Sequence, residues 1–369
     1  MKNKYYSKAF LICLFSCGLI ACNNDAGQQG KVVQGAPQTE VKDWATTSLP
    51  DISQQPVRLR VANVVNPRFE QLSEKQISQI LVRSQQLVKQ YFDIDVEFSE
   101  TRTLSIKDVF GHLSKEIIAE RQKEIVDIDF IDKQVRENMQ QALFKTLTLY
   151  RENMNNVIEF AQPYLIHPEE KQKNFIELSY ALTDTLISRL GYWKKQVASD
   201  GYPVLDSNGY HQWVWWDSLG YGNLPYDVVI TNQLVASAEY YGMDVHSSIR
   251  GGLTAGTTTY DKNTQFNGYA YIMVYPMLND TDLLTTLRQD ESYTEKQIVD
   301  YSAALLSHEL GHLLLHLGHP FGNRACIMSP TVMLNYRDWY GNLDASRCAV
   351  GSSKDMQPGA VELEYNRRW

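Results

Sequence analysis

The segment His308-Glu309-Leu310-Gly311-His312 places three side chains that could do chemistry at a fixed spacing. Because an α-helix rises 1.5 Å per residue, histidines four positions apart lie about 6 Å apart along one helix face. Neutral imidazoles at this spacing can share one zinc ion, and the carboxylate of Glu309 can reach a water molecule beside that ion. The pattern predicts one catalytic Zn²⁺ bound by His308 and His312, with Glu309 as general base and acid.

A long helix is predicted to carry this motif. Thr294 and Gln297 have the spacing of a capping box, so the helix is expected to begin there and to run through the two histidines. The leucines fall on the side of the helix that faces away from the histidines: Leu306, Leu310, Leu313, Leu314 and Leu317. We therefore expect the leucine face to be buried and the histidine face to line a polar cleft.

A second motif follows at Cys326-Ile327-Met328-Ser329-Pro330. Together with the first, it resembles the metzincin group of zinc peptidases, in which a tight turn places a methionine beneath the metal. The resemblance covers residues 308–330. It implies that Met328 forms this turn, and that the fold is α+β with a zincin-like core, in which a twisted mixed sheet packs with the active-site helix. It also implies an endopeptidase that hydrolyses peptide bonds with a zinc-bound water activated by Glu309.

A catalytic zinc site needs a third protein ligand and an open position. The metzincin pattern has a glycine at the position of Leu315 and a histidine at the position of Gly318, whereas this chain offers His316 and His319. His319 can reach the metal if the helix ends near Leu315 and the chain turns back through Gly318. We predict His319 as the third ligand.

Several alternatives stay open. His316 is a competing third ligand, and a downstream acid such as Asp338 or Asp344 would make the site similar to that of gluzincin peptidases. A zincin fold that has lost catalysis and serves as a binding lipoprotein is a different class of function. Tyr336 lies where a tyrosine stabilises the oxyanion in some metzincins, but its longer spacing from the turn favours a packing role.

The N-terminus resembles the leader of bacterial lipoproteins. Three lysines and an apolar run at 9–21 lead into Leu19-Ile20-Ala21-Cys22, which is similar to a lipobox. The resemblance implies that residues 1–21 are a signal peptide, that Cys22 carries a lipid anchor, and that the protein lies in the cell envelope. Asn23 favours the outer membrane. The alternative is an ordinary secretory signal followed by a chance cysteine.

Charge and cysteine content limit the partners and the chemistry. Removal of the leader with its three lysines would change the formal net charge from −8 to −11, which argues against a nucleic-acid partner. The expected partner is a peptide or protein substrate. Cys326 and Cys348 are the cysteines left after Cys22, so a disulfide between them is predicted. A free or metal-bound thiolate at Cys326 is the alternative.

The folded part is predicted in three sections after a tether at 22–54. These are an N-terminal part of the core at 55–104, a helical insertion at 105–198, and a catalytic part at 199–369. His112 and His167, both in the insertion, are interpreted as packing or surface histidines.

Alternating and apolar runs predict the strands. Strands at 57–65 and 93–98 flank a helix at 73–92, which predicts a βαβ unit with parallel strands. A buried strand is expected within 226–232. Strand-like runs at 250–260 and 269–277 flank Asn267-Gly268, which indicates a hairpin. The first of these runs would either close the sheet or pair with an extended peptide at its edge.

Overall fold

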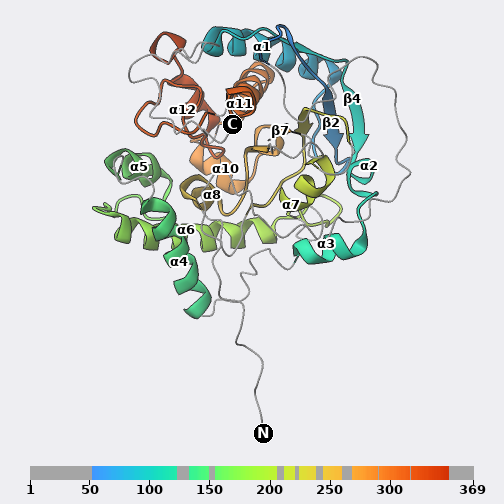
Figure 1. Ribbon diagram of the computed structural model, residues 1–369. Coiled ribbons are helices and arrows are strands. Elements are labelled where there is room, and N and C mark those ends of the chain that lie inside the picture. The colour runs from blue at the N-terminus through green and yellow to red at the C-terminus, as the bar shows by residue number, and fades with distance from the viewer. Residues whose placement is uncertain are drawn as a thin grey trace, which may run out of the picture.

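The computed structural model describes most of the chain after residue 51. The described ranges are 52–122, 133–148, 154–205, 212–220, 224–237, 244–259, 268–289, 291–315 and 317–348. The predicted signal peptide, the lipidation site Cys22 and the tether lie outside the described residues. Helices surround a mixed sheet, so the predicted α+β class is confirmed (Figure 1).

A five-stranded sheet with the order β4-β2-β5-β7-β6 forms the centre. Its strands are β2 (Val61–Val65), β4 (Arg102–Ser105), β5 (Val228–Thr231), β6 (Gly256–Thr259) and β7 (Tyr269–Met273). The first four strands in the order are parallel, and β6 lies antiparallel to β7 at the edge. Every residue of β5 and β7 is buried, as expected for apolar strands inside a parallel sheet.

Two strand predictions can be compared with this sheet. The buried strand expected within 226–232 is β5, and the two runs expected to form a hairpin contain β6 and β7. Asn267 of the predicted turn lies outside the described residues. Because β6 is the edge strand, the hairpin both closes the sheet and leaves one strand side without a neighbour among the described strands.

The predicted βαβ unit is also present. Strands β1 (Val57–Leu59) and β3 (Val96–Phe98) pair in parallel, and α1 (Glu74–Phe92) connects them. Ser73 begins α1 with a capping box, and Asp93 ends it in the left-handed conformation at φ 54°.

The single strand expected at 57–65 is wrong, because Arg60 divides it into β1 and β2. The backbone nitrogen and Nε of Arg60 donate to Asp227 Oδ2 at 2.7 and 2.8 Å, and Nη2 donates to Oδ1 at 2.6 Å. Both side chains are 7% exposed. Because the backbone N–H of Arg60 is bonded to Asp227, it does not donate to a neighbouring strand. The chain is interrupted at this residue, and β1 and β2 belong to different sheets.

The predicted helical insertion at 105–198 begins with the last residue of β4, and helices form most of its described part. The helices are α2 (Ile106–Phe110), α3 (Lys115–Gln122), α4 (Lys133–Leu147), α5 (Met154–Ala161), η2 (Gln162–Tyr164) and α6 (Phe175–Lys195). Helix α6 packs against α8 (Val245–Arg250), and Figure 1 shows the two in neighbouring positions. Trp193 Nε1 donates to the Arg250 carbonyl at 3.0 Å, and Arg189 donates to the Ile249 carbonyl. The helical region therefore supports α8.

The second half of the chain supplies the other helices. They are α7 (Gln212–Trp215), η3 (Trp216–Gly220), α9 (Tyr275–Leu278), α10 (Asp282–Leu287), α11 (Glu295–Leu315), α12 (Tyr336–Gly341) and η4 (Ala345–Arg347). Among the described residues, none of the helices combines the length and apolar character needed to cross a membrane.

Helix α11 carries His308, Glu309 and His312, and both sides of it are largely buried. It packs against α1 and against strands β6 and β7, and the hydroxyls of Ser84 and Ser307 join the two helices at 2.9 Å. Thr294 and Gln297 form the predicted cap. Strands β6 and β7 cover part of the histidine side, where His308 is only 2% exposed and His312 is partly exposed.

The Arg60–Asp227 pair gives a first prediction. Asp227→Ala leaves a buried guanidinium without its partner, so the free energy of unfolding should fall by about 3–5 kcal/mol. Urea denaturation followed by circular dichroism measures this change. Glu97→Ala is the matched control, because the Arg58–Glu97 pair is exposed and should contribute at most about 1 kcal/mol. Equal losses in the two variants would contradict the role given to the buried pair.

Candidate metal centre

Three histidine side chains converge at the C-terminal end of α11. The Nε2 atoms of His308, His312 and His319 are each 3.1 Å from the other two. His319 reaches the group because α11 ends at Leu315 and the following residues turn back, with Leu317 N donating to Gly311 O at 3.4 Å. The three ring nitrogens form a group that could hold a metal ion. His316 lies outside the described residues.

Backbone carbonyls bind two of the rings at Nδ1, the nitrogen that does not face the other histidines. His308 Nδ1 donates to the Ile327 carbonyl at 2.8 Å, and His312 Nδ1 donates to the Leu317 carbonyl. A proton on Nδ1 leaves a lone pair on Nε2, so these bonds fix the tautomer that a metal requires. Burial lowers the pKa of His312 to about 4 and holds the pKa of His308 and His319 well below 6.5, which favours neutral rings.

The spacing of the nitrogens fits zinc. A tetrahedral ion with Zn–N bonds of 2.0–2.1 Å places its imidazole nitrogens about 3.3 Å apart. The observed 3.1 Å is close to this value for all three pairs. Lone pairs directed at one another at this distance repel unless a cation or a proton lies among them. His308 is buried, whereas His312 and His319 are partly exposed, so the group can be reached from their side.

The predicted Met-turn, which is the tight turn around Met328, packs against α11 at Gly311. Ser329 N donates to the Cys326 carbonyl at 2.9 Å, which closes a tight turn around the fully buried Met328. A methyl group at Gly311 would overlap the Met328 sulfur, so the glycine allows the turn to approach the helix. Cys326 and Cys348 lie at disulfide-bonding distance, with their Cα atoms 4.8 Å apart.

Strand β6 holds the carboxylate of Glu309. Thr258 Oγ1 lies 3.0 Å from Glu309 Oε2 and 2.8 Å from the Glu309 carbonyl. A Cβ atom on Gly256 would lie 2.6 Å from Glu309 Oε1. Burial raises the pKa of Glu309 to about 8, while the Thr258 hydroxyl and the charge of Arg250 act in the opposite direction. A raised pKa makes the ionised carboxylate a stronger proton acceptor.

Helix α8 adds a histidine that sequence reasoning missed. The ring of His246 meets that of His319 edge to face, with centroids 4.8 Å apart, and its Nε2 lies 3.0 Å from Asp244 Oδ2. Burial alone would raise the pKa of Asp244, but His246 and the Ser247 backbone N–H hold it at about 2. The segment carries no motif and lies far from residue 308 in sequence, so spacing could not have revealed it.

Arg250, one turn later on α8, was missed for the same reason. Its Nη2 donates to the carbonyl and the hydroxyl of Thr331 at 2.8 and 3.0 Å, just beyond the Met-turn. The side chain is buried, and its positive charge lowers the pKa values of both Glu309 and Tyr336. Helix α8 thus joins the Met-turn region to the environment of the glutamate.

The alternative third ligands with described positions lie elsewhere. Asp338 Oδ2 accepts from the Tyr164 hydroxyl at 2.9 Å and from Arg324 Nη2 at 2.8 Å. Asp344 Oδ1 accepts from the backbone of Ser346 at 3.0 Å. Neither acid belongs to the group formed by the three histidines.

Tyr336 is fully buried, and burial raises its pKa above the ordinary value for tyrosine. Its ring stacks on Tyr301, and its hydroxyl has no hydrogen-bond partner among the described residues. This position agrees with the packing role expected from the sequence.

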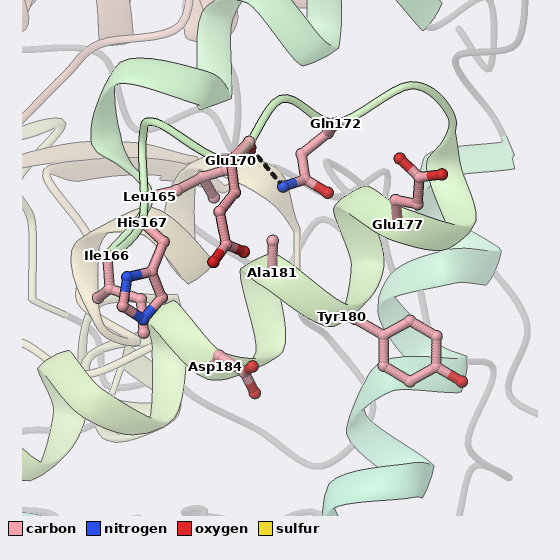
Figure 2. Close-up of a pocket in the computed structure, with 9 residues that line it drawn as sticks. All are labelled: Leu165, Ile166, His167, Glu170, Gln172, Glu177, Tyr180, Ala181 and Asp184. Carbon is pink, nitrogen blue, oxygen red and sulfur yellow. Dashed lines mark hydrogen bonds between the residues drawn. The ribbon is translucent and has the colours of Figure 1, made fainter.

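A second group of possible ligands lies on the surface of the helical region. His167, Glu169 and Glu170 are all exposed, and His167 and Glu170 border a pocket of about 280 Å³ against α6. Figure 2 shows Glu170, His167 and Asp184 around this hollow, with Tyr180 further along the helix. Asp184 already pairs with Arg136. Because exposed charges of this kind are stable in water without a ligand, we assign no chemistry to the pocket.

Comparisons with other proteins do not identify the chain. It matches no protein-family profile, no curated protein and no solved structure. The functional interpretation therefore depends on the residues of the site and on the resemblance over residues 308–330.

Zinc content tests the choice of ligands. The purified protein should hold close to one zinc per chain, measured by mass spectrometry of the metal after dialysis. His319→Ala should remove that zinc, because two imidazoles alone make an incomplete site. His316→Ala and the exposed control His167→Ala should keep it. Loss of zinc from His316→Ala with retention in His319→Ala would overturn the assignment.

The close contact between Gly311 and Met328 gives a third prediction. Alanine is favoured over glycine inside a helix by about 1 kcal/mol, but overpacking a buried contact costs about 1–3 kcal/mol. Gly311→Ala should therefore lower the free energy of unfolding in urea and weaken zinc binding. Gly341→Ala is the control, because a Cβ there meets no atom within 4 Å. A Gly311→Ala variant as stable as the control would show that the contact is loose.

Proposed function

We propose that this protein is a zinc-dependent endopeptidase with a zincin-like core, related in its site to the metzincins. The observation that carries the proposal is the joint placement of three convergent imidazoles and one buried glutamate. His308, His312 and His319 bring their nitrogens to 3.1 Å from one another, and Glu309 follows His308 directly on the same helix.

The three histidines would hold a single Zn²⁺ ion and leave one position open. A zinc ion bound in this way acidifies a water molecule and polarises a carbonyl group. The carbonyls of Ile327 and Leu317 keep His308 and His312 in the tautomer that offers Nε2, so the ligands need no rearrangement.

Glu309 would move the proton. As an ionised carboxylate it would accept a proton from the water that attacks the scissile carbonyl, and it would then deliver that proton to the departing amine. The side chain is only 4% exposed, so bulk water competes little for this transfer. Because water screens charges poorly at a buried site, a charge that develops beside Glu309 during the reaction would interact strongly with its carboxylate.

The edge strand β6 offers a place for the substrate. An extended peptide can add to a free sheet edge through main-chain hydrogen bonds, and β6 is the edge strand closest to Glu309. This placement would bring the peptide backbone past the glutamate without requiring a particular side chain. It supports an endopeptidase acting on extended segments of protein.

We further propose that the enzyme is a lipoprotein of the cell envelope, anchored through Cys22, as the lipobox-like sequence implies. The positions taken by Asp338 and Asp344 argue against either acid as a gluzincin-type ligand. A non-catalytic zincin fold that binds a partner is the remaining alternative, and it differs in what happens when Glu309 is changed.

Glu309→Gln separates the two functions. The amide cannot accept the proton, so cleavage of a broad peptide mixture should fall by at least about a hundredfold. Zinc content should stay near one per chain, because the three ligands are untouched. Mass spectrometry of the digested mixture measures cleavage, with Glu169→Gln as an exposed control. Undiminished cleavage by Glu309→Gln, or no cleavage by the zinc-loaded wild type, would refute the peptidase proposal.

A further inference from the structure

We propose that Thr258 is a positioning residue, which holds the carboxylate of Glu309 so that strand β6 fixes the geometry of the base. This inference rests on the proposed function, because it concerns the glutamate that acts as the base in that function. Thr258 itself would not touch the reacting atoms.

The hydroxyl of Thr258 contacts both the side chain and the main chain of Glu309. The hydroxyl lies 3.0 Å from Oε2 and 2.8 Å from the main-chain oxygen. A hydroxyl has one proton to donate, and an ionised carboxylate is a stronger acceptor than a neutral carbonyl. When Glu309 is ionised, the bond to Oε2 is therefore favoured, and it restrains a side chain that otherwise turns about three bonds.

Gly256 restrains the second carboxylate oxygen. A Cβ atom at this position would lie 2.6 Å from Glu309 Oε1 and 2.8 Å from the Tyr271 carbonyl, so the strand backbone approaches the carboxylate closely. Gly256 and Thr258 are two residues apart and face the same side of β6. The carboxylate is thus held by one face of one strand.

The pairing of β6 with β7 determines where Gly256 and Thr258 lie relative to Glu309. Gly256 pairs with Ile272 and Thr258 pairs with Ala270, both on the buried strand β7. Because a slip of one residue would turn Thr258 away from α11, the antiparallel pairing determines which hydroxyl meets the glutamate. The edge of this strand that has no neighbour among the described strands is where we place the peptide.

A merely structural role for Thr258 makes a different prediction. If the hydroxyl only joins β6 to α11, its loss should reduce stability or zinc content and should affect catalysis through them. If it positions the base, reactions that use the carboxylate should suffer in protein that is still fully folded and holds one zinc. Two readouts at the carboxylate distinguish the roles: kcat for peptide cleavage, and the affinity of the zinc-loaded protein for acetohydroxamic acid.

Acetohydroxamic acid is a suitable probe because it chelates zinc and offers a hydroxyl proton to a neighbouring carboxylate. Its binding needs Glu309 in position but needs no peptide cleavage. Isothermal titration of the zinc-loaded protein gives its Kd, and Glu309→Gln gives the reference for loss of the carboxylate.

The variants are Thr258→Val, which removes the hydroxyl and keeps the shape, and Thr258→Ser, which keeps the hydroxyl. Thr257→Val is the matched control, since it removes a hydroxyl from the neighbouring residue on the other face of β6. We expect Thr258→Val to unfold at a somewhat lower urea concentration, because two buried acceptors lose their donor, but to be fully folded with one zinc under the assay conditions. Its kcat should fall about 10- to 100-fold with KM nearly unchanged, and its Kd for acetohydroxamic acid should rise about tenfold. Thr258→Ser should restore both, and Thr257→Val should resemble the wild type.

The outcomes separate this inference from the proposed function. Wild-type kcat and Kd in Thr258→Val would overturn the inference, as would an equal loss in Thr258→Ser or a loss that follows zinc content. If the wild type cleaves no peptide, the proposed function fails, but a weaker Kd in Thr258→Val alone still supports Thr258 as the positioning residue. A zinc-loaded wild type that binds no acetohydroxamic acid contradicts both.

Discussion

The hydrogen bonds from His308 and His312 to two backbone carbonyls determine what the rest of the site can do. A helix alone sets the spacing of the two imidazoles, but it does not decide which nitrogen carries the proton or where the third ring comes from. The carbonyls of Ile327 and Leu317 decide the tautomer, and they belong to the segment that also delivers His319. The return of the chain after Leu315 is therefore the constraint on which metal binding by these three rings would depend.

The surrounding fold keeps that segment in place from several directions. Phe92 at the end of α1 and Met328 of the turn both contact the helix at Gly311, so the helix end lies between two buried side chains. From another side, Trp193 of α6 donates to the carbonyl of Arg250, whose guanidinium in turn bonds beyond the Met-turn. The helical region at 105–198 thus supports the surroundings of the three histidines through α8, although no sequence pattern connects the two.

Features with local causes were predictable, and features with long-range causes were not. The cap at Thr294, the turn around Met328 and the pairing of β6 with β7 follow from short patterns of residue type. The interruption at Arg60 depends on Asp227, and the position of His246 beside His319 depends on how α8 packs. No spacing in the sequence encodes such contacts, because they form only when distant segments are brought together by the core.

X-ray absorption at the zinc edge of the zinc-loaded protein tests most directly whether the three histidines bind the metal. The geometry predicts three imidazole nitrogens and one further light atom at about 2.0–2.1 Å, with the outer-shell scattering typical of histidine rings. A sulfur scatterer at about 2.3 Å would instead show a cysteine thiolate ligand such as Cys326. That result, or a spectrum with fewer than three imidazoles, would contradict the site formed by His308, His312 and His319.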